Sequence, residues 1–166
     1  MKSNRKITKK VIKYYLETKL EIKMPSLLCG VVKGSFLGIN ELIVYVSKDL
    51  YLPHQVLKNE AWSMLTPDQI NLHSASVYSQ SNFIYFACGV KENGKPTKKV
   101  YFLDVNNPKK YFLADFKLDF KLFCPIVCSI NGLVVFAGGK TMEGTCNYLF
   151  YSKQINFNSW KKNFGF

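Results

Sequence analysis

An internal repeat with a spacing of 50 residues is the feature that most constrains the fold of this chain. Residues 82–89, NFIYFACG, match residues 131–139, NGLVVFAGG, and both are apolar runs that end at glycine. Each run predicts a buried β-strand followed by a turn in which a side chain would be unfavourable. The same spacing relates Val77 to Val127, Ser79 to Ser129, Gly94 to Gly144 and Tyr101 to Tyr151. Repeated units of this length bury their apolar faces by stacking, so we expect an array of similar strand-rich units.

Each unit predicts several short strands. In the second unit we expect strands near 74–79, 83–88, 99–105 and 110–114, and in the third near 125–130, 133–138, 147–152 and 157–162. Residues 42–47 are the first unit's counterpart of residues 83–88, at a spacing of 41 residues. The segment around Trp62 predicts an outer strand whose indole packs between neighbouring units. The expected units span approximately residues 26–72, 73–122 and 123–166.

The N-terminal segment, residues 1–24, predicts a short helix and a link. Ser3 or Asn4 is a suitable N-cap, and a helical pattern runs to about residue 18. The apolar side of that helix would hold Ile7, Val11, Tyr14 and Tyr15. Residues 20–24 alternate between apolar and charged side chains and are followed by Pro25, which favours a short extended link.

The basic charge of the chain is concentrated in the same segment. The formal net charge is +12, and residues 1–23 hold eight Lys or Arg and two Glu. Such a segment can attract nucleic acid, and the candidate anchor residues are Lys6, Lys9, Lys10 and Lys13. Charge runs are more often solvated faces, and we favour that interpretation.

The sequence offers no set of residues suited to catalysis, a metal or a cofactor. His54 and His73 are the two histidines, and neither has metal-ligand spacing to another His or to a Cys pair. The five cysteines are odd in number and scattered, which indicates reduced thiols, with Cys88 and Cys146 filling core space. No apolar run reaches the roughly 18 to 20 residues of a membrane span, and the basic start lacks the apolar core of a secretory signal. We therefore expect a non-enzymatic cytoplasmic protein without cofactor or membrane contact.

Residues 109–123 combine lysines with aromatics and allow two interpretations. Exposed aromatics above a basic groove can stack on nucleic-acid bases. However, Phe116, Leu118, Phe120 and Leu122 alternate with Lys117, Asp119 and Lys121, as expected when one face is buried. We favour a core role for these aromatics.

The order of residues in the repeat resembles the kelch family. An apolar strand is followed by glycines (Gly89; Gly138 and Gly139), then by Tyr (Tyr101; Tyr151), then by a further aromatic (Tyr111; Trp160). The resemblance covers roughly residues 26–164 and implies that the glycines allow turns where blades crowd together and the aromatics pack between blades. It implies an all-β fold, a partial β-propeller of about three four-stranded blades. The N-terminal segment is similar to the last helix of the BACK region in BTB-BACK-kelch proteins.

The resemblance also implies a function. It suggests the substrate-recognition part of a ubiquitin-ligase adaptor that lacks a BTB domain, and hence a protein-interaction module. The candidate contact loops contain Lys91, Asn93, Lys95, Lys140, Glu143 and Thr145. Because three blades cannot close a ring, we expect a truncated product, a homodimer of six blades, or another protein partner that covers the open faces. The alternative is a basic RNA- or ribosome-associated protein anchored by its N-terminal lysines.

Overall fold

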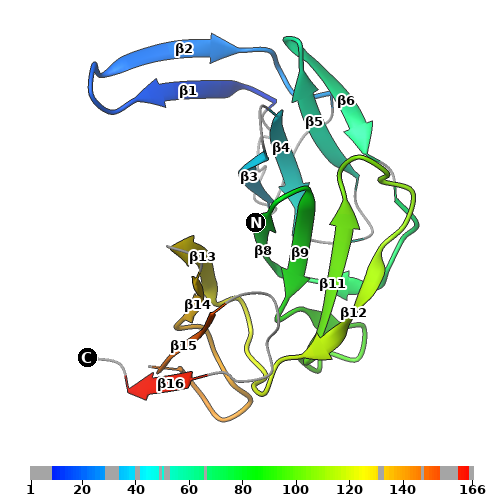
Figure 1. Ribbon diagram of the computed structural model, residues 1–166, viewed down its shortest axis with the longest axis vertical. Coiled ribbons are helices and arrows are strands. Elements are labelled where there is room, and N and C mark those ends of the chain that lie inside the picture. Colours follow the sequence, from blue (N-terminus) through cyan, green and yellow to red (C-terminus); the bar gives the residue numbers. More distant parts are fainter. Residues whose placement is uncertain are drawn as a thin grey trace, which may run out of the picture.

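The regular elements of this protein are antiparallel β-strands, as expected for an all-β chain. The computed structural model describes residues 9–28, 34–39, 42–48, 50, 53–65, 67–130, 133–146, 148–153 and 161–164. These residues form three four-stranded sheets and two two-stranded pairings, and they include no helix (Figure 1).

Each four-stranded sheet is a meander in which every strand pairs with the next one in the sheet. The first sheet contains β3 (Gly34–Ile39), β4 (Leu42–Ser47), β5 (His54–Lys58) and β6 (Ala61–Leu65). The second contains β8 (Ser76–Gln80), β9 (Phe83–Ala87), β11 (Lys99–Asp104) and β12 (Phe112–Lys117). The third contains β13 (Ile126–Ile130), β14 (Leu133–Ala137), β15 (Tyr148–Lys153) and β16 (Lys161–Phe164). The strands predicted for the second and third units, and those at 42–47 and around Trp62, are therefore present to within a few residues, whereas β3 and β5 were not predicted.

The sequence repeat is also a repeat of backbone pairing. β7 (Leu72–His73) pairs with β10 (Val90–Lys91) through His73 and Val90. Fifty residues later, Phe123 pairs with Lys140 in the same way. The second and third units thus each pair the segment that precedes their first strand with the segment that follows their second strand.

One expected equivalence is wrong by a residue. Tyr101 pairs with Phe86 in the second sheet, whereas Phe150 pairs with Phe136 in the third. Phe150, rather than Tyr151, therefore occupies the place of Tyr101. The loop between the second and third strands is one residue shorter in the third sheet, so the spacing of 50 does not extend beyond that loop.

The first strands of the three sheets lie side by side. β8 contacts both β3 and β13, and the fourth strands β6, β12 and β16 lie toward the outside (Figure 1). The Ser79 hydroxyl lies 3.4 Å from the Gly38 carbonyl oxygen, and the Ser76 hydroxyl donates to the Pro125 carbonyl at 2.7 Å. These contacts join positions about one repeat apart, so the repeat in the sequence sets the order of the sheets in space.

Apolar side chains fill the spaces between the sheets. Val46 and Phe86 belong to the core between the first and second sheets, and Tyr78 and Phe136 to the core between the second and third. Side chains of β9 alternate between these two cores, because successive residues of a strand point to opposite faces. The second sheet is therefore buried on both faces.

The predicted N-terminal helix is wrong. β1 (Val11–Tyr15) and β2 (Leu20–Met24) form an antiparallel hairpin that projects from the first sheet, with Val11 opposite Met24 (Figure 1). β1 is rich in β-branched and aromatic residues, which favour strands, and the base of the hairpin gains apolar contact with the first sheet. The expectation of extended backbone at residues 20–24 is confirmed. Lys6 and the suggested N-cap residues lie outside the described part of the chain.

Candidate functional site

The first candidate contact loop connects β9 to β11 and folds on itself through backbone hydrogen bonds. Lys91 N–H donates to the Lys95 carbonyl (3.0 Å), and Gly94 N–H donates to the Lys91 carbonyl (2.9 Å). The Asn93 side-chain oxygen accepts from Lys95 N–H (3.1 Å). Residues 91–95 are all exposed. Because the loop satisfies its own backbone groups, its lysine side chains are presented on an ordered turn.

The second candidate loop occupies the equivalent position between β14 and β15. Thr141 N–H donates to the Gly144 carbonyl (2.7 Å), and Glu143 N–H donates to the Thr141 hydroxyl (3.2 Å). Lys140 is held at the base of the loop by two backbone hydrogen bonds with Phe123. Lys140, Glu143 and Thr145 are exposed. The structure therefore brings the six predicted contact residues onto two exposed turns of the same kind.

A cavity of about 430 Å³ adjoins the first loop. It is lined by Ile70, Asn71, Leu72, Lys91, Glu92, Asn93, Thr97 and Tyr101. The Asn71 amide donates to the Glu92 carboxylate at 2.5 Å, and Leu72 is buried. Amide, ammonium and carboxylate groups around an apolar floor can bind a peptide side chain and its backbone.

The repeat glycines meet different constraints. Gly139 has a φ of 88°, and a Cβ at this position would lie 2.7 Å from the Phe123 carbonyl oxygen. Gly138 also has a positive φ, of 66°. Gly89 has little room for a different reason, because a Cβ there would meet the Leu72 side chain at 2.5 Å. Glycine is required at the start of the second loop by both backbone conformation and close approach.

The predicted aromatic positions lie mostly at sheet boundaries. Trp62 on β6 is 8 % exposed, packs toward the hairpin, and donates its indole N–H to the Pro25 carbonyl at 2.9 Å. Tyr111 is buried between the first and second sheets, where Tyr101 packs against the same core. Tyr151 is partly buried on the third sheet. Trp160 lies outside the described residues.

His54 forms a buried link between two sheets that the sequence did not indicate. Its Nδ1 accepts from Ser47 N–H at 3.1 Å, and its Nε2 lies 2.6 Å from the Tyr111 hydroxyl. Accepting at Nδ1 leaves the proton on Nε2, so the ring donates to Tyr111, whose hydroxyl faces the Leu50 carbonyl at 3.4 Å. Burial lowers the pKa of His54 to about 4. The ring is neutral near pH 7 and has a structural role.

The candidate basic anchor does not form a helical face. Lys13 lies on β1, and Lys9 and Lys10 precede that strand and are exposed. The Lys9 ammonium donates to the Leu28 carbonyl at 2.9 Å. Lys6 is not among the described residues. Lys9 and Lys10 therefore lie at the base of the hairpin, and Lys13 lies on its first strand.

The aromatic stretch of residues 109–123 has a core role, as favoured above. Leu118, Phe120 and Leu122 are buried, and the intervening charged residues are exposed. β12 ends at Lys117, so this alternation continues beyond the strand itself. The Phe120 ring stacks on the Phe150 ring at 4.0 Å between centroids. Tyr111 and Phe120 are thus not available to stack on nucleic-acid bases, and Phe116 is half-buried.

Two of the cysteines are buried and two are exposed among the described residues. Within the described ranges, no three His, Cys, Asp or Glu side chains group as a metal site, and no helix is long and apolar enough to cross a membrane. Cys88 and Cys146 are buried free thiols, as expected, whereas Cys124 and Cys128 are exposed. Burial raises the pKa of Cys88, which keeps it protonated.

No protein-family model matches this chain, and a comparison with curated proteins finds no match.

Proposed function

We propose that this chain is a non-enzymatic protein-interaction module whose three sheets are kelch-type blades of an incomplete propeller. The adjacent first strands, the apolar cores between sheets and the hydrogen bonds between repeat-related positions support this arrangement. The kelch resemblance adds that the partner is a protein recognised for ubiquitination. Such a module would bind this partner or compete for it.

The observation that carries the proposal is the pair of equivalent, exposed loops. Both are ordered by their own hydrogen bonds, and the first adjoins a cavity with a mixed polar and apolar lining. Lys91, Lys95 and Lys140 give these turns basic side chains. A partner segment with carboxylates and one apolar side chain fits this combination, because its carboxylates complement the lysines. The loops are already ordered, so binding costs little conformational entropy of the module.

The test is affinity capture with the full chain, compared with two matched variants. Lys91→Glu combined with Lys95→Glu reverses charge on the first loop. Lys117→Glu combined with Lys121→Glu reverses the same amount of charge on exposed lysines at and beyond the end of β12. We expect protein partners that resist nuclease treatment and are lost with the loop variant alone.

A second candidate, binding of RNA or ribosomes, is favoured by the net charge of +12. This function would make capture sensitive to nuclease, and affinity would fall steeply with salt. It would also make the two charge-reversal variants similarly defective. That combination of results would replace the protein-interaction proposal.

A further inference from the structure

In the chain, the β1–β2 hairpin precedes the first sheet in the same way that the third and fourth strands of one sheet precede the next sheet. A segment of similar length connects Met24 to β3, Leu65 to β8 and Lys117 to β13. Leu27 follows β2 in the chain, and its N–H donates to the carbonyl of Lys9, before β1, at 2.9 Å. In the same way Leu118 follows β12, and its N–H donates to the carbonyl of Lys98, before β11, at 2.9 Å. Leu27 and Leu118 are both buried. The hairpin thus corresponds to the third and fourth strands of a preceding sheet.

The strands that would complete that sheet are not found among the described residues. In each complete sheet the third strand pairs with the second, as β5 does with β4, β11 with β9 and β15 with β14. β1 pairs only with β2 in the part of the chain that the structure describes. Among the described residues nothing pairs with its other edge, whose backbone N–H and C=O groups can accept a strand.

The face of the first sheet that is directed toward the hairpin is only partly covered. Tyr45 and its repeat counterpart Phe86, 41 residues later, are 4 % and 0 % exposed, so both are covered. Phe36 is 50 % exposed, whereas its counterpart Val77 is 6 % exposed. Val77 lies in the core between the first and second sheets. No neighbouring sheet of the described residues covers Phe36 in the way that the first sheet covers Val77. The exposed part of this face of the first sheet therefore lies at its first strand, β3.

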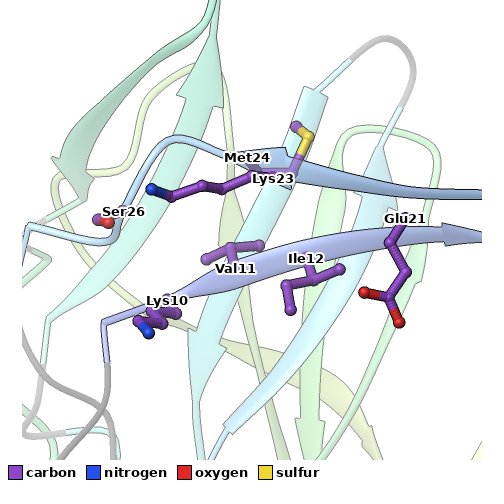
Figure 2. Close-up of a pocket in the computed structure, with 7 residues that line it drawn as sticks. All are labelled: Lys10, Val11, Ile12, Glu21, Lys23, Met24 and Ser26. Carbon is purple, nitrogen blue, oxygen red and sulfur yellow. The ribbon is translucent and has the colours of Figure 1, made fainter.

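A groove lies at this position, between the hairpin and the first sheet. A cavity of about 310 Å³ is lined by Val11, Ile12 and Met24 from the hairpin and by Phe36, Ile43 and Trp62 from the sheet. A second cavity of about 320 Å³ shares part of this lining. Figure 2 shows Lys10, Lys23 and Glu21 around the second cavity, with Val11 and Ile12 between them. The groove therefore has an apolar floor and a mainly basic rim.

We propose that the free edge of β1 and this groove bind an extended acidic segment of another protein, which adds to β1 as a strand. Backbone pairing would supply affinity, and alternate side chains would enter the apolar groove or face the lysines. Exposed Lys10, Lys19 and Lys23 outnumber the exposed acidic residues Glu17 and Glu21 of the hairpin. A second copy would bring the same basic hairpin and repel it, so charge favours an acidic partner. This site is separate from the loops of the proposed function.

The probe is a synthetic peptide of alternating valine and glutamate, six residues long like β4. Its control alternates valine and lysine. Binding is measured by amide hydrogen exchange and by backbone chemical shifts of the full chain. We expect the acidic peptide to slow exchange in β1 by about tenfold or more at saturation, and the basic peptide to leave it unchanged.

Matched variants locate the site. Phe36→Asp changes the floor of the groove, and Leu113→Asp changes an equally exposed apolar residue on β12, 52 % exposed against 50 %. We expect the first to weaken the peptide affinity by about tenfold or more and the second to leave it unchanged. Lys10→Glu combined with Lys23→Glu avoids the core and should weaken binding by a similar factor. Lys91→Glu combined with Lys95→Glu should not weaken it, which separates this site from the loop surface.

Three results would overturn the proposal. The first is unchanged exchange in β1 at millimolar acidic peptide. The second is equal weakening by Phe36→Asp and Leu113→Asp, which would place the peptide elsewhere. The third is a dimer in sedimentation whose β1 amides are protected without peptide, which would make a second copy the occupant.

Discussion

Two neighbouring polar residues of β5 connect the first sheet to both of its neighbours. His54 donates to Tyr111, which directly precedes β12 of the second sheet, and Gln55 accepts from the N–H of Leu28, which follows the hairpin, at 2.7 Å. Both side chains are fully buried. Because successive residues of a strand face opposite sides, one dipeptide can join two interfaces. Buried polar groups of this kind require partners, so they define how the sheets are placed.

Acid should destabilise the protein through His54. The folded state has a pKa of about 4, below the ordinary value of 6.5, so the unfolded state binds the proton more tightly. The stabilisation by neutral His54 is complete above pH 6.5 and is lost as the pH falls toward 4, by about 3 kcal/mol in total. Urea unfolding at a series of pH values across this range measures the loss of unfolding free energy. The chemical shifts of the His54 ring protons, followed by NMR, report its protonation. A His54 ring that titrates near pH 6.5 in the folded protein would contradict the prediction.

Gly139 should not tolerate alanine. Its φ of 88° is unfavourable for any side chain, and the new Cβ would press on the Phe123 carbonyl. We expect Gly139→Ala to lower the free energy of unfolding by about 1–3 kcal/mol. Gly38→Ala is the control, since a Cβ there meets nothing within 4 Å. Equal stability of the two variants in urea unfolding would show that the turn relaxes without cost.

At the level of the element, the hairpin depends on its base. Isolated two-stranded hairpins are only marginally stable in water, and this one has exposed Leu16 and Leu20 near its tip, 84 % and 53 % exposed. Its stability comes from Val11 and Met24, which pack against the first sheet, and from the Trp62 hydrogen bond to Pro25. Tertiary contact at one end therefore sustains the strand pairing of the whole hairpin.

Replacing Trp62 by Phe tests this dependence. The variant keeps an aromatic ring but leaves the Pro25 carbonyl without its indole donor, a loss of about 1 kcal/mol. We expect faster hydrogen exchange in β1 and β2, with β8 and β9 unchanged as internal controls. Unchanged exchange in the hairpin would mean that apolar packing alone holds it.

At the level of the whole molecule, each sheet has one or two neighbouring sheets, as in a linear array. The core of the first two sheets and the core of the last two share the second sheet but have different residues. Arrays of this type are stabilised by units and by contacts between neighbours. Damage in one core should therefore weaken the nearest sheets more than the distant one.

Phe136→Ala provides the test of this behaviour. Phe136 is fully buried in the core of the second and third sheets, so its truncation should cost about 3–5 kcal/mol. We expect loss of amide protection in β13 to β15, with protection retained in β4 and β5. Val44→Ala, in the other core, should act preferentially on the first sheet. Equal loss of protection in all three sheets would instead indicate a single cooperative unit.

The N-terminal segment shows where prediction from sequence failed. Val11, Tyr14 and Tyr15 fit one face of a helix, but the same residues also suit a strand. The apolar face of the first sheet decides between them, because it accepts Val11 and Met24 side by side. The link from His54 to Tyr111 has the same origin, since no local pattern relates residues 57 positions apart.

The sequence by itself determined the strands of the second and third sheets, two strands of the first, and the alternating burial of residues 116–122. These features depend on alternation, on apolar runs and on glycine, all of which act over a few residues. Tertiary structure alone decided the hairpin, the one-residue offset of Tyr151 and the buried His54 link. The hairpin and the His54 link arise from contacts between separate elements, where shape and desolvation override local preference, and the offset arises from a loop that is one residue shorter in the third sheet.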